Sequence, residues 1–288
     1  MFSLEKLRYK YIMLDISGKL ITWIVGTSLL AWLLKFAYLP AFEQLALPGI
    51  ARETLLQPWS LLTYGFLHNG IFHLLFNMLV LNTVGRSILN VLGSKPFLSL
   101  FLMGVLAGGI GFTVATFFAP IYFSSAYMVG ASAGVYALLF LLCFYMPDTE
   151  VRLIVWNVKL LYIAYALLAF DVFAIIGRSN AGGSVAHLMG AALGYVAAQN
   201  MQNGNDITSG FRRVLDFFNN LFSGSYTKQK KSPLKTVFKN KAPQAYARNP
   251  RKSSHQEQID VVLDKISTSG YESLTAAEKE VLFKAGKQ

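Results

Sequence analysis

The sequence predicts an all-α membrane protein, a bundle of six transmembrane helices with a small helical appendage at its C-terminus. The 288 residues are 54% hydrophobic and 14% charged, with a mean hydropathy of +0.43, unlike a soluble domain of this length. The apolar residues also gather in separate blocks, most of them near the length that crosses a bilayer at about 1.5 Å of rise per residue. The few polar residues inside these blocks are therefore informative.

Six blocks of apolar residues define the predicted spans. They cover residues 20–39, 72–90, 97–119, 131–146, 160–177 and 185–198. The fourth and sixth blocks are short, so we expect tilted helices or helices that begin inside a water-filled cavity. The first block is too long for the apolar part of a signal peptide, and no small-residue cleavage site follows it, so we expect a retained helix. The single cysteine, Cys143, excludes a disulfide framework.

Basic residues predict the orientation of the bundle. They gather before the first block, after the second and after the fourth: Lys6, Arg8, Lys10, Lys19, Arg86, Lys95, Arg152 and Lys159. In the opposite connections Arg52 is offset by Glu43 and Glu53, and only Arg178 follows the fifth block. The positive-inside rule therefore places both termini in the cytoplasm, and an even number of spans agrees.

The net charge of +11 is concentrated after the last block. Between residues 205 and 252, Lys and Arg far outnumber the acidic residues Asp206 and Asp216. Because this run adjoins a membrane helix, we expect it to bind anionic lipid headgroups and not nucleic acid. Apolar residues recur at helical spacing from Phe211 to Phe222, which predicts either a helix in the membrane interface or one packed under the bundle.

The composition divides the chain into four parts. They are a cytoplasmic N-terminal segment (1–19), the membrane domain (20–200), a basic amphipathic segment and linker (201–252), and a two-helix appendage (253–288). In the appendage a helical stripe runs from Ile259 to Ile266, and Gly270 can end that helix. Thr275 and Glu278 have the spacing of a capping box that begins a second helix. We expect docking or regulation here, and no chemistry.

Ser132 and His187 are the most informative polar residues of the predicted bundle. Burying a hydroxyl and an imidazole in lipid costs free energy unless they find partners, and the simplest partners are each other. Ser132 follows Gly130 at the outer start of the fourth helix, where unpaired N–H groups favour a developing anion. His187 lies at the same depth on the sixth helix. We therefore expect a nucleophile and a base in hydrogen-bond contact.

Small residues on the two helices favour this contact. Gly190 and Gly194 form a small face below the histidine, and we expect Gly134 and Ala137 to form the matching face on the fourth helix. Tyr136 follows Ser132 by four residues, so its ring shares the serine's face and can pack against an imidazole. Without these neighbours, a lone helical serine or buried histidine would indicate only helix packing.

A third element lies at the outer start of the second helix. His73 and Asn77 are four residues apart and share a face, whereas His68 points elsewhere. A zinc site would prefer two histidines at that spacing with a carboxylate or cysteine nearby, and the sequence has neither. We expect no metal and no cofactor. As hydrogen-bond donors, His73 and Asn77 suit an oxyanion beside the backbone N–H of Ser132.

Asp171 in the fifth helix is the only candidate carboxylate for a third catalytic member. Because the fifth helix runs outward, we place Asp171 below the proposed site and expect a structural role. The prediction is therefore a two-residue dyad of Ser132 and His187. Such a dyad needs neutral His187, so activity should fall on acidification.

These residues together resemble the rhomboid family of intramembrane serine proteases, in its bacterial six-helix form with a C-terminal cytoplasmic extension. The resemblance covers about residues 20–200. It implies that Ser132 attacks the scissile carbonyl and that His187 transfers the proton. It also assigns roles to four further residues. His73 and Asn77 would hold the oxyanion, Tyr136 would stack on the histidine, and His68 would line the water-accessible mouth.

The same resemblance implies a multi-pass protein of the bacterial inner membrane. Its substrates would be transmembrane segments with small residues at the cut, entering beside the fifth helix. Two departures stand out: Ala133 occupies a position where the family commonly has glycine, and the 40–58 loop lacks a Trp-Arg pair. An inactive relative that binds membrane-protein clients is one alternative. A transporter is another, but it would need charged pairs or corresponding half-repeats.

Overall fold

The computed structural model describes residues 4–123, 127–153, 155–222 and 254–285. The chain divides into two compact units, Met1–Tyr226 and Thr227–Gln288. The first unit carries the apolar blocks, and the second carries the appendage.

The six predicted spans are all helices in the first unit. They are α2 (Ile16–Ala37), α6 (Ile71–Leu92), α7 (Ser94–Phe118), α9 (Ser132–Tyr145), α10 (Leu160–Ile176) and α11 (Ala181–Gln202). Four of these, α2, α6, α7 and α11, are long and apolar enough to cross a membrane, and α9 and α10 are shorter. The chain is therefore a mostly helical protein with several candidate membrane spans.

The expectation that the sixth span is short is wrong. Helix α11 has 22 residues, whereas α9 has 14 and α10 has 17. The apolar window missed the two ends of α11 because they carry Gly182, Gly183 and several amide side chains. These residues lower hydropathy without ending the helix, since α11 packs along both α9 and α7. Hydropathy located the helix but underestimated its length.

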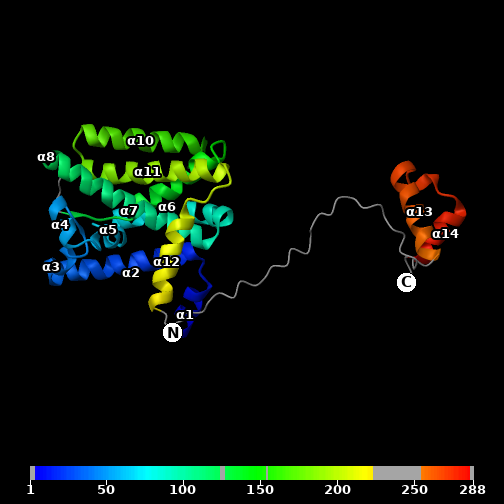
Figure 1. The fold of residues 1–288 in the computed structure, drawn as a ribbon, viewed down its shortest axis with the longest axis horizontal. Helices are drawn as coiled ribbons and strands as arrows, with labels where there is room; N and C mark the ends of the chain where they lie inside the picture. The colour runs from blue at the N-terminus through cyan, green and yellow to red at the C-terminus, as the bar shows by residue number, and fades with distance from the viewer. Residues whose placement is uncertain (1–3, 124–126, 154, 223–253, 286–288) are drawn as a thin grey trace. The chain divides into compact units, whose positions relative to one another are not determined.

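Further elements precede, connect and follow the six helices. In chain order they are α1 (Leu4–Met13), α3 (Leu39–Glu43), β1 (Leu47–Pro48), α4 (Ala51–Leu56), α5 (Ser60–Thr63), η1 (Tyr64–Phe66), α8 (Pro120–Phe123), β2 (Tyr127–Met128), β3 (Glu150–Leu153), β4 (Trp156–Lys159) and α12 (Thr208–Phe222). Strands β1 and β2 pair antiparallel, as do β3 and β4. Figure 1 shows α3, α4 and α8 at one end of the long helices and α1 and α12 at the other.

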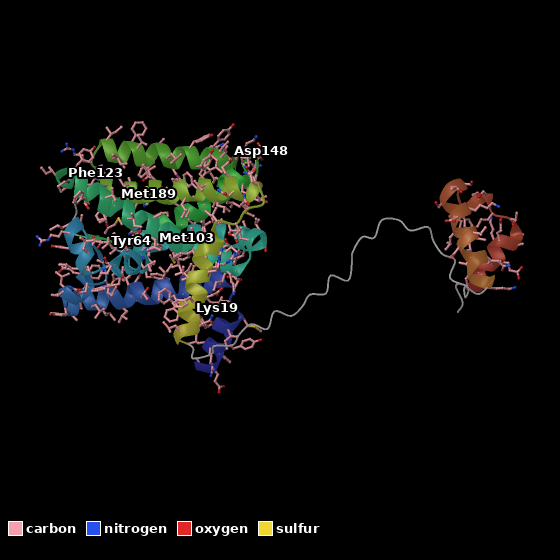
Figure 2. The ribbon with its side chains drawn as sticks, in the orientation of Figure 1. Lys19, Tyr64, Met103, Phe123, Asp148 and Met189 are labelled. Carbon is pink, nitrogen blue, oxygen red and sulfur yellow. The ribbon has the colours of Figure 1, made fainter. Side chains whose placement is uncertain are left out.

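Helix α9 is the most buried of the six helices, and Figure 1 shows α10 at one edge of the unit. Almost every residue of α9 from Ala133 to Cys143 is buried, against α6, α7, α10 and α11. Large apolar side chains are instead exposed on the outer helices: Phe36 of α2 is 94% exposed, Phe72 of α6 73% and Phe173 of α10 72%. Side chains of this kind surround the bundle in Figure 2. An apolar girdle of this kind suits contact with hydrocarbon and not with water.

The backbones of α9 and α11 touch at two glycines. A Cβ atom on Gly190 would lie 2.2 Å from the carbonyl oxygen of Ala133, and one on Gly194 would lie 2.4 Å from that of Ala137. The predicted small face of α11 is thus confirmed. The matching role expected of Gly134 is wrong, because its open side faces the ring of Phe101 on α7. On α9, the backbone at Ala133 and Ala137 makes the contact with α11.

The Ala133 methyl group packs against a glycine of α7. Its side chain is buried, and a Cβ on Gly108 would lie 2.4 Å from the Ala133 methyl group. The methyl group that departs from the family pattern therefore occupies space that a glycine on the neighbouring helix leaves open. Close packing of this kind leaves no room for a second methyl group.

Helix α12 carries the predicted amphipathic stripe. It packs against α7, and Asp216 lies 3.6 Å from the Lys95 ammonium. Part of its apolar face stays exposed, including Val214 and Phe218. Packing under the bundle and contact with the membrane interface are therefore compatible on one helix.

The second unit contains α13 (Ser254–Ser269), η2 (Tyr271–Ser273) and α14 (Ala276–Ala285). Gly270 follows α13 with a φ of 77°, as its predicted role as a helix end requires. The predicted capping box is also confirmed: the Thr275 N–H donates to Glu278 Oε2 at 2.7 Å, and the Glu278 N–H donates to Thr275 Oγ1 at 3.4 Å. The helix stripe buries Val262 but leaves Leu263 half exposed.

Candidate active site

Ser132 and His187 meet as the sequence predicts. Ser132 Oγ lies 2.8 Å from His187 Nε2, and His187 Nδ1 lies 2.9 Å from Asp171 Oδ1. Because a carboxylate only accepts, its ring partner Nδ1 donates, which leaves Nε2 of a neutral imidazole as the acceptor for the serine hydroxyl. The three side chains form one hydrogen-bonded chain across α9, α11 and α10.

The predicted placement of Asp171 below the site is therefore wrong. Asp171 is fully buried and is in contact with His187. Only Leu160, Ala164 and Asp171 are buried on α10, and their spacing puts all three on one face of that helix, which packs on α11. Depth along the helix is a poor guide here. The spacing of the three residues in the sequence already indicates that they share this face.

Tyr136 stacks on the imidazole, as predicted. The two rings lie 4.5 Å apart at 18°, and Phe140 stacks behind Tyr136 at 5.5 Å. The His187 ring is thus held by a hydroxyl, a carboxylate and an aromatic face. These contacts fix its orientation.

Gly130 allows the chain to turn into α9 beside His73. Its φ is 139°, a conformation that other residues rarely adopt, and a Cβ there would lie 2.8 Å from the His73 ring. The Gly130 N–H donates to the Tyr64 carbonyl at 3.0 Å. Pairing of β1 with β2 holds the same loop from its other side. Ser132 therefore begins α9 from a fixed loop.

His68 does not line a water-accessible mouth, and that expectation is wrong. Its side chain is fully buried, with Nδ1 3.0 Å from Ser28 Oγ and Nε2 accepting from the Ala131 N–H at 3.4 Å. The Trp32 indole N–H donates to its backbone carbonyl at 2.7 Å. His68 therefore links α2 to the loop before Ser132. The expectation that it points away from His73 is also wrong, because the two rings meet edge to face with their centroids 4.9 Å apart.

The two predicted oxyanion donors lie in different environments. The His73 ring lines the cavity beside Ser132. Asn77 is buried and donates its amide to the His73 carbonyl at 2.9 Å, and it is not one of the cavity-lining residues. The structure brings His73 to the site and leaves Asn77 one helical turn behind it.

A cavity of about 550 Å³ adjoins Ser132 and His187. Besides these two and His73, its lining includes Tyr64 and Phe123. Figure 2 shows Phe123 toward one end of the bundle and Lys19 and Asp148 toward the other. The cavity thus lies toward the end away from the predicted cytoplasmic connections.

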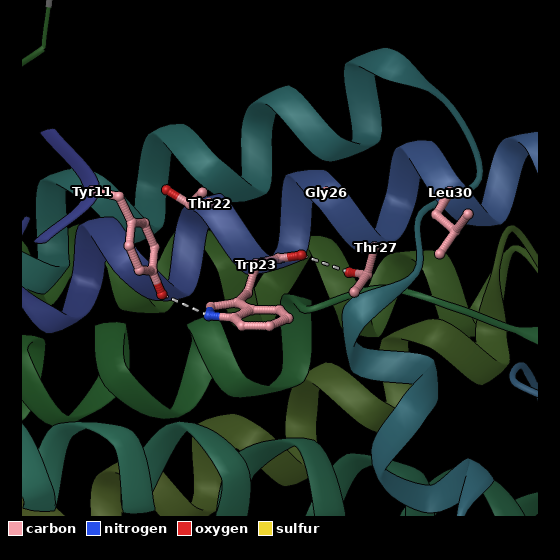
Figure 3. Close-up of a pocket in the computed structure, with 6 residues that line it drawn as sticks. All are labelled: Tyr11, Thr22, Trp23, Gly26, Thr27 and Leu30. Carbon is pink, nitrogen blue, oxygen red and sulfur yellow. Dashed lines mark hydrogen bonds between the residues drawn. The ribbon is translucent and has the colours of Figure 1, made fainter. Parts of the chain in front are cut away.

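A second hollow of about 380 Å³ lies on α2 and carries no comparable chemistry. Figure 3 shows its lining residues, where the Trp23 indole N–H donates to the Tyr11 hydroxyl at 2.9 Å and the Thr27 hydroxyl donates to the Trp23 carbonyl at 2.8 Å. Its lining contains no histidine, carboxylate or serine. Within the described ranges, no three His, Cys, Asp or Glu side chains gather as metal ligands would. Of these two hollows, the one beside Ser132 carries the residues suited to catalysis.

Comparison with known families gives two matches along the chain. Residues 55–201 match the Rhomboid domain, which is about half of the chain and includes all the site residues. Residues 247–287 match a family of unknown function, DUF6576. The second match falls on the appendage and adds no activity to it.

Two relatives share parts of the chain. Rhomboid-related protein 3 of Homo sapiens is 39% identical over 82 residues, or 28% of this chain and 19% of its own length. Rhomboid protease GluP of Bacillus subtilis is 33% identical over 141 residues, or 49% of this chain and 25% of its own length. The chain thus matches about a quarter or less of each relative. Together with the apolar helices and the domain match, these similarities show that the chain belongs to the rhomboid family of intramembrane serine proteases.

Proposed function

We propose that this protein is an intramembrane serine endopeptidase that hydrolyses peptide bonds in or next to transmembrane segments of other membrane proteins. One observation carries the proposal: a serine hydroxyl lies 2.8 Å from a histidine Nε2, at a cavity, on two mainly apolar helices. An isolated buried pair would be a costly way to join two helices that already pack through glycines. The similarity to a protein named as a rhomboid protease supports the same activity.

The reaction follows from this geometry. Ser132 Oγ attacks the scissile carbonyl carbon, and its proton passes to His187 Nε2. The tetrahedral intermediate collapses as the carbon–nitrogen bond breaks, and His187 gives the proton to the leaving amine. A water molecule then loses a proton to His187, attacks the acyl-serine and releases the carboxylic acid, with the proton returned to Ser132 Oγ.

The intermediate carries a negative charge on the former carbonyl oxygen. The backbone N–H at the start of α9 and the His73 side chain, which lines the cavity with Ser132, are the donors that we assign to this oxygen. Asn77 already donates to the His73 carbonyl and does not line the cavity. We therefore assign the larger share of oxyanion stabilisation to the N–H and His73.

We infer further that the protein spans the bacterial inner membrane several times with both termini in the cytoplasm. The cavity lies away from the bundle end that carries Lys19, so cleavage would occur near the outer face. The partners are transmembrane protein substrates, and the basic segment that follows the bundle binds anionic headgroups. Nucleic acid is not a partner in this proposal, and no cofactor or metal is needed.

The test is cleavage of a generic transmembrane substrate in liposomes by the wild type, Ser132→Ala and His187→Ala. Ser99→Ala is the matched control, because Ser99 is buried on α7 and does not line the cavity. We expect cleavage by the wild type and the control, and none above background by the two site variants. Equal cleavage by all four would contradict the proposal.

An inactive protein that binds membrane-protein clients is the alternative outcome. In that case the wild type would leave every tested substrate intact but would retain it during co-purification from liposomes. Ser132→Ala would retain it equally well. An active rhomboid protease predicts retention mainly by the serine variant, because the wild type releases its products.

A further inference from the structure

We propose that Asp171 is a positioning residue of the catalytic site, so that the working unit is Ser132, His187 and Asp171 and not a dyad. The proposal rests on the proposed protease function and deepens it. The carrying observation is the 2.9 Å contact between Asp171 Oδ1 and His187 Nδ1, on the side of the ring opposite Ser132.

Burial makes a purely structural role for Asp171 costly. Its side chain is fully buried in a helix that is otherwise apolar, and within the described part of the chain Oδ2 accepts no hydrogen bond. The described ion pairs give it one cationic partner, His187. A buried carboxylate in direct contact with an imidazole has a strong electrostatic influence on that ring.

The contact also selects the form of His187 that the reaction needs. With Nδ1–H donating to the carboxylate, Nε2 is free of hydrogen and accepts the Ser132 proton. As that proton arrives, the ring becomes positively charged, and the adjacent carboxylate stabilises it. Both effects raise the rate of the chemical step, and neither requires Asp171 to touch the substrate.

The location of Asp171 makes this alignment depend on a third helix. Ser132 and the stacked Tyr136 lie on α9, His187 lies on α11, and Asp171 reaches the ring from α10. Helix α10 buries just two other side chains, Leu160 and Ala164, both in its first turns. Asp171 is therefore the one fully buried side chain in the second half of α10, and it contacts His187.

The experiment compares steady-state cleavage in liposomes by the wild type, Asp171→Asn, Asp171→Leu and Leu160→Ala. Rates are normalised to the folded fraction measured by gel filtration in detergent. We expect kcat to fall by about 10²–10⁴-fold in both Asp171 variants, with KM changed less than about threefold. Asn keeps the size of the side chain and loses its charge, and Leu removes the polar burial as well.

Leu160→Ala is the matched control for packing. It loosens the same helix at its other end without touching His187, so it should lower thermal stability and leave kcat within about threefold. An unchanged kcat in Asp171→Asn and Asp171→Leu would overturn the positioning role while leaving the protease function intact. An equal loss in Leu160→Ala would also overturn it, by tracing the effect to helix packing. No cleavage by the wild type would overturn the proposed function and this role with it.

Discussion

His187 is held between two helix contacts of opposite character. On the α9 side, backbone meets backbone, because Gly190 and Gly194 bring α11 against the Ala133 and Ala137 carbonyls. On the α10 side, only three side chains of the helix are buried, and the contact to His187 is one buried carboxylate. The distance between serine and histidine is thus set by the main chain, and the orientation of the ring by side chains.

This difference predicts how substitutions at each contact affect stability and activity. Main-chain contacts in a packed interior cannot yield by a rotamer change, so an added methyl group must separate the helices. A lost side-chain contact leaves the helices in place and changes only the ring. Variants on the α9 side should therefore affect stability and activity together, and those on the α10 side mainly kcat.

The largest effect is expected for Gly190→Ala. Its Cβ would lie 2.2 Å from the Ala133 carbonyl oxygen, so α9 and α11 must separate next to Ser132. We expect a loss of about 1–3 kcal/mol of stability and a fall in cleavage of about 100-fold or more. Thermal unfolding and liposome cleavage measure the two effects.

Gly26→Ala on α2 is the matched control for that change. A Cβ on Gly26 meets nothing within 4 Å, so stability and cleavage should stay close to those of the wild type. If Gly190→Ala behaved like Gly26→Ala, the main chain would not set the distance between serine and histidine.

The next effect separates two donors on the same helix. His73→Ala should lower kcat by about 10²–10³-fold, because its ring lines the cavity beside Ser132. Asn77→Ala should lower it less, because the Asn77 amide is already bonded to the His73 carbonyl. Steady-state kinetics of the two variants decide this, and an equal loss would mean that Asn77 turns toward the substrate during the reaction.

A smaller effect tests the packing of Ala133 against α7. Gly108→Ala would bring two methyl carbons to 2.4 Å, and we expect it to cost about 1–3 kcal/mol. Adding Ala133→Gly should restore part of that loss. A double-mutant cycle in thermal or denaturant unfolding measures the coupling, and strictly additive effects would show that the two sites do not compete for space.

The smallest effect is expected in the second unit, where no site residue lies. The Lys265 ammonium donates to both carboxylate oxygens of Glu278 at 2.8 and 2.9 Å, and with Thr275 it lowers the pKa of Glu278 to about 2. Since this pKa is below its usual value of 4.5, the stabilisation is complete above that pH and is lost as pH falls toward about 2.

Hydrogen exchange of the full chain tests this contact. Protection of α13 and α14 should weaken on acidification from about pH 6 to about pH 3. Glu278→Gln should show the weaker protection at both values and leave substrate cleavage unchanged. If Glu278→Gln kept wild-type protection at about pH 6, the Lys265 contact would not stabilise this unit.

The sequence was sufficient for the helices and for the pair of catalytic candidates. Apolar blocks located the six helices, and glycines four residues apart marked the close face of α11. The capping box at Thr275 was also readable, because such motifs depend on local spacing. Each of these features is local, or repeats along one helix.

Features that depend on how helices rotate against one another were harder to predict. The burial of His68 and the contact of Asp171 with His187 both require knowing which face of a helix meets which neighbour. The open side of Gly134 faces α7 for the same reason. The spacing of residues along a helix shows which of them share a face, but the packing of the helices determines which neighbour that face contacts.

The most direct test of the central claim is covalent labelling of the nucleophile. A serine-reactive fluorophosphonate is added to the wild type, Ser132→Ala and His187→Ala in liposomes, and the modified residue is mapped by mass spectrometry. The account predicts that Ser132 is labelled in the wild type, that Ser132→Ala takes no label at the site, and that His187→Ala is labelled at least about 100-fold more slowly. Labelling of Ser132 at the same rate in wild type and His187→Ala would contradict it.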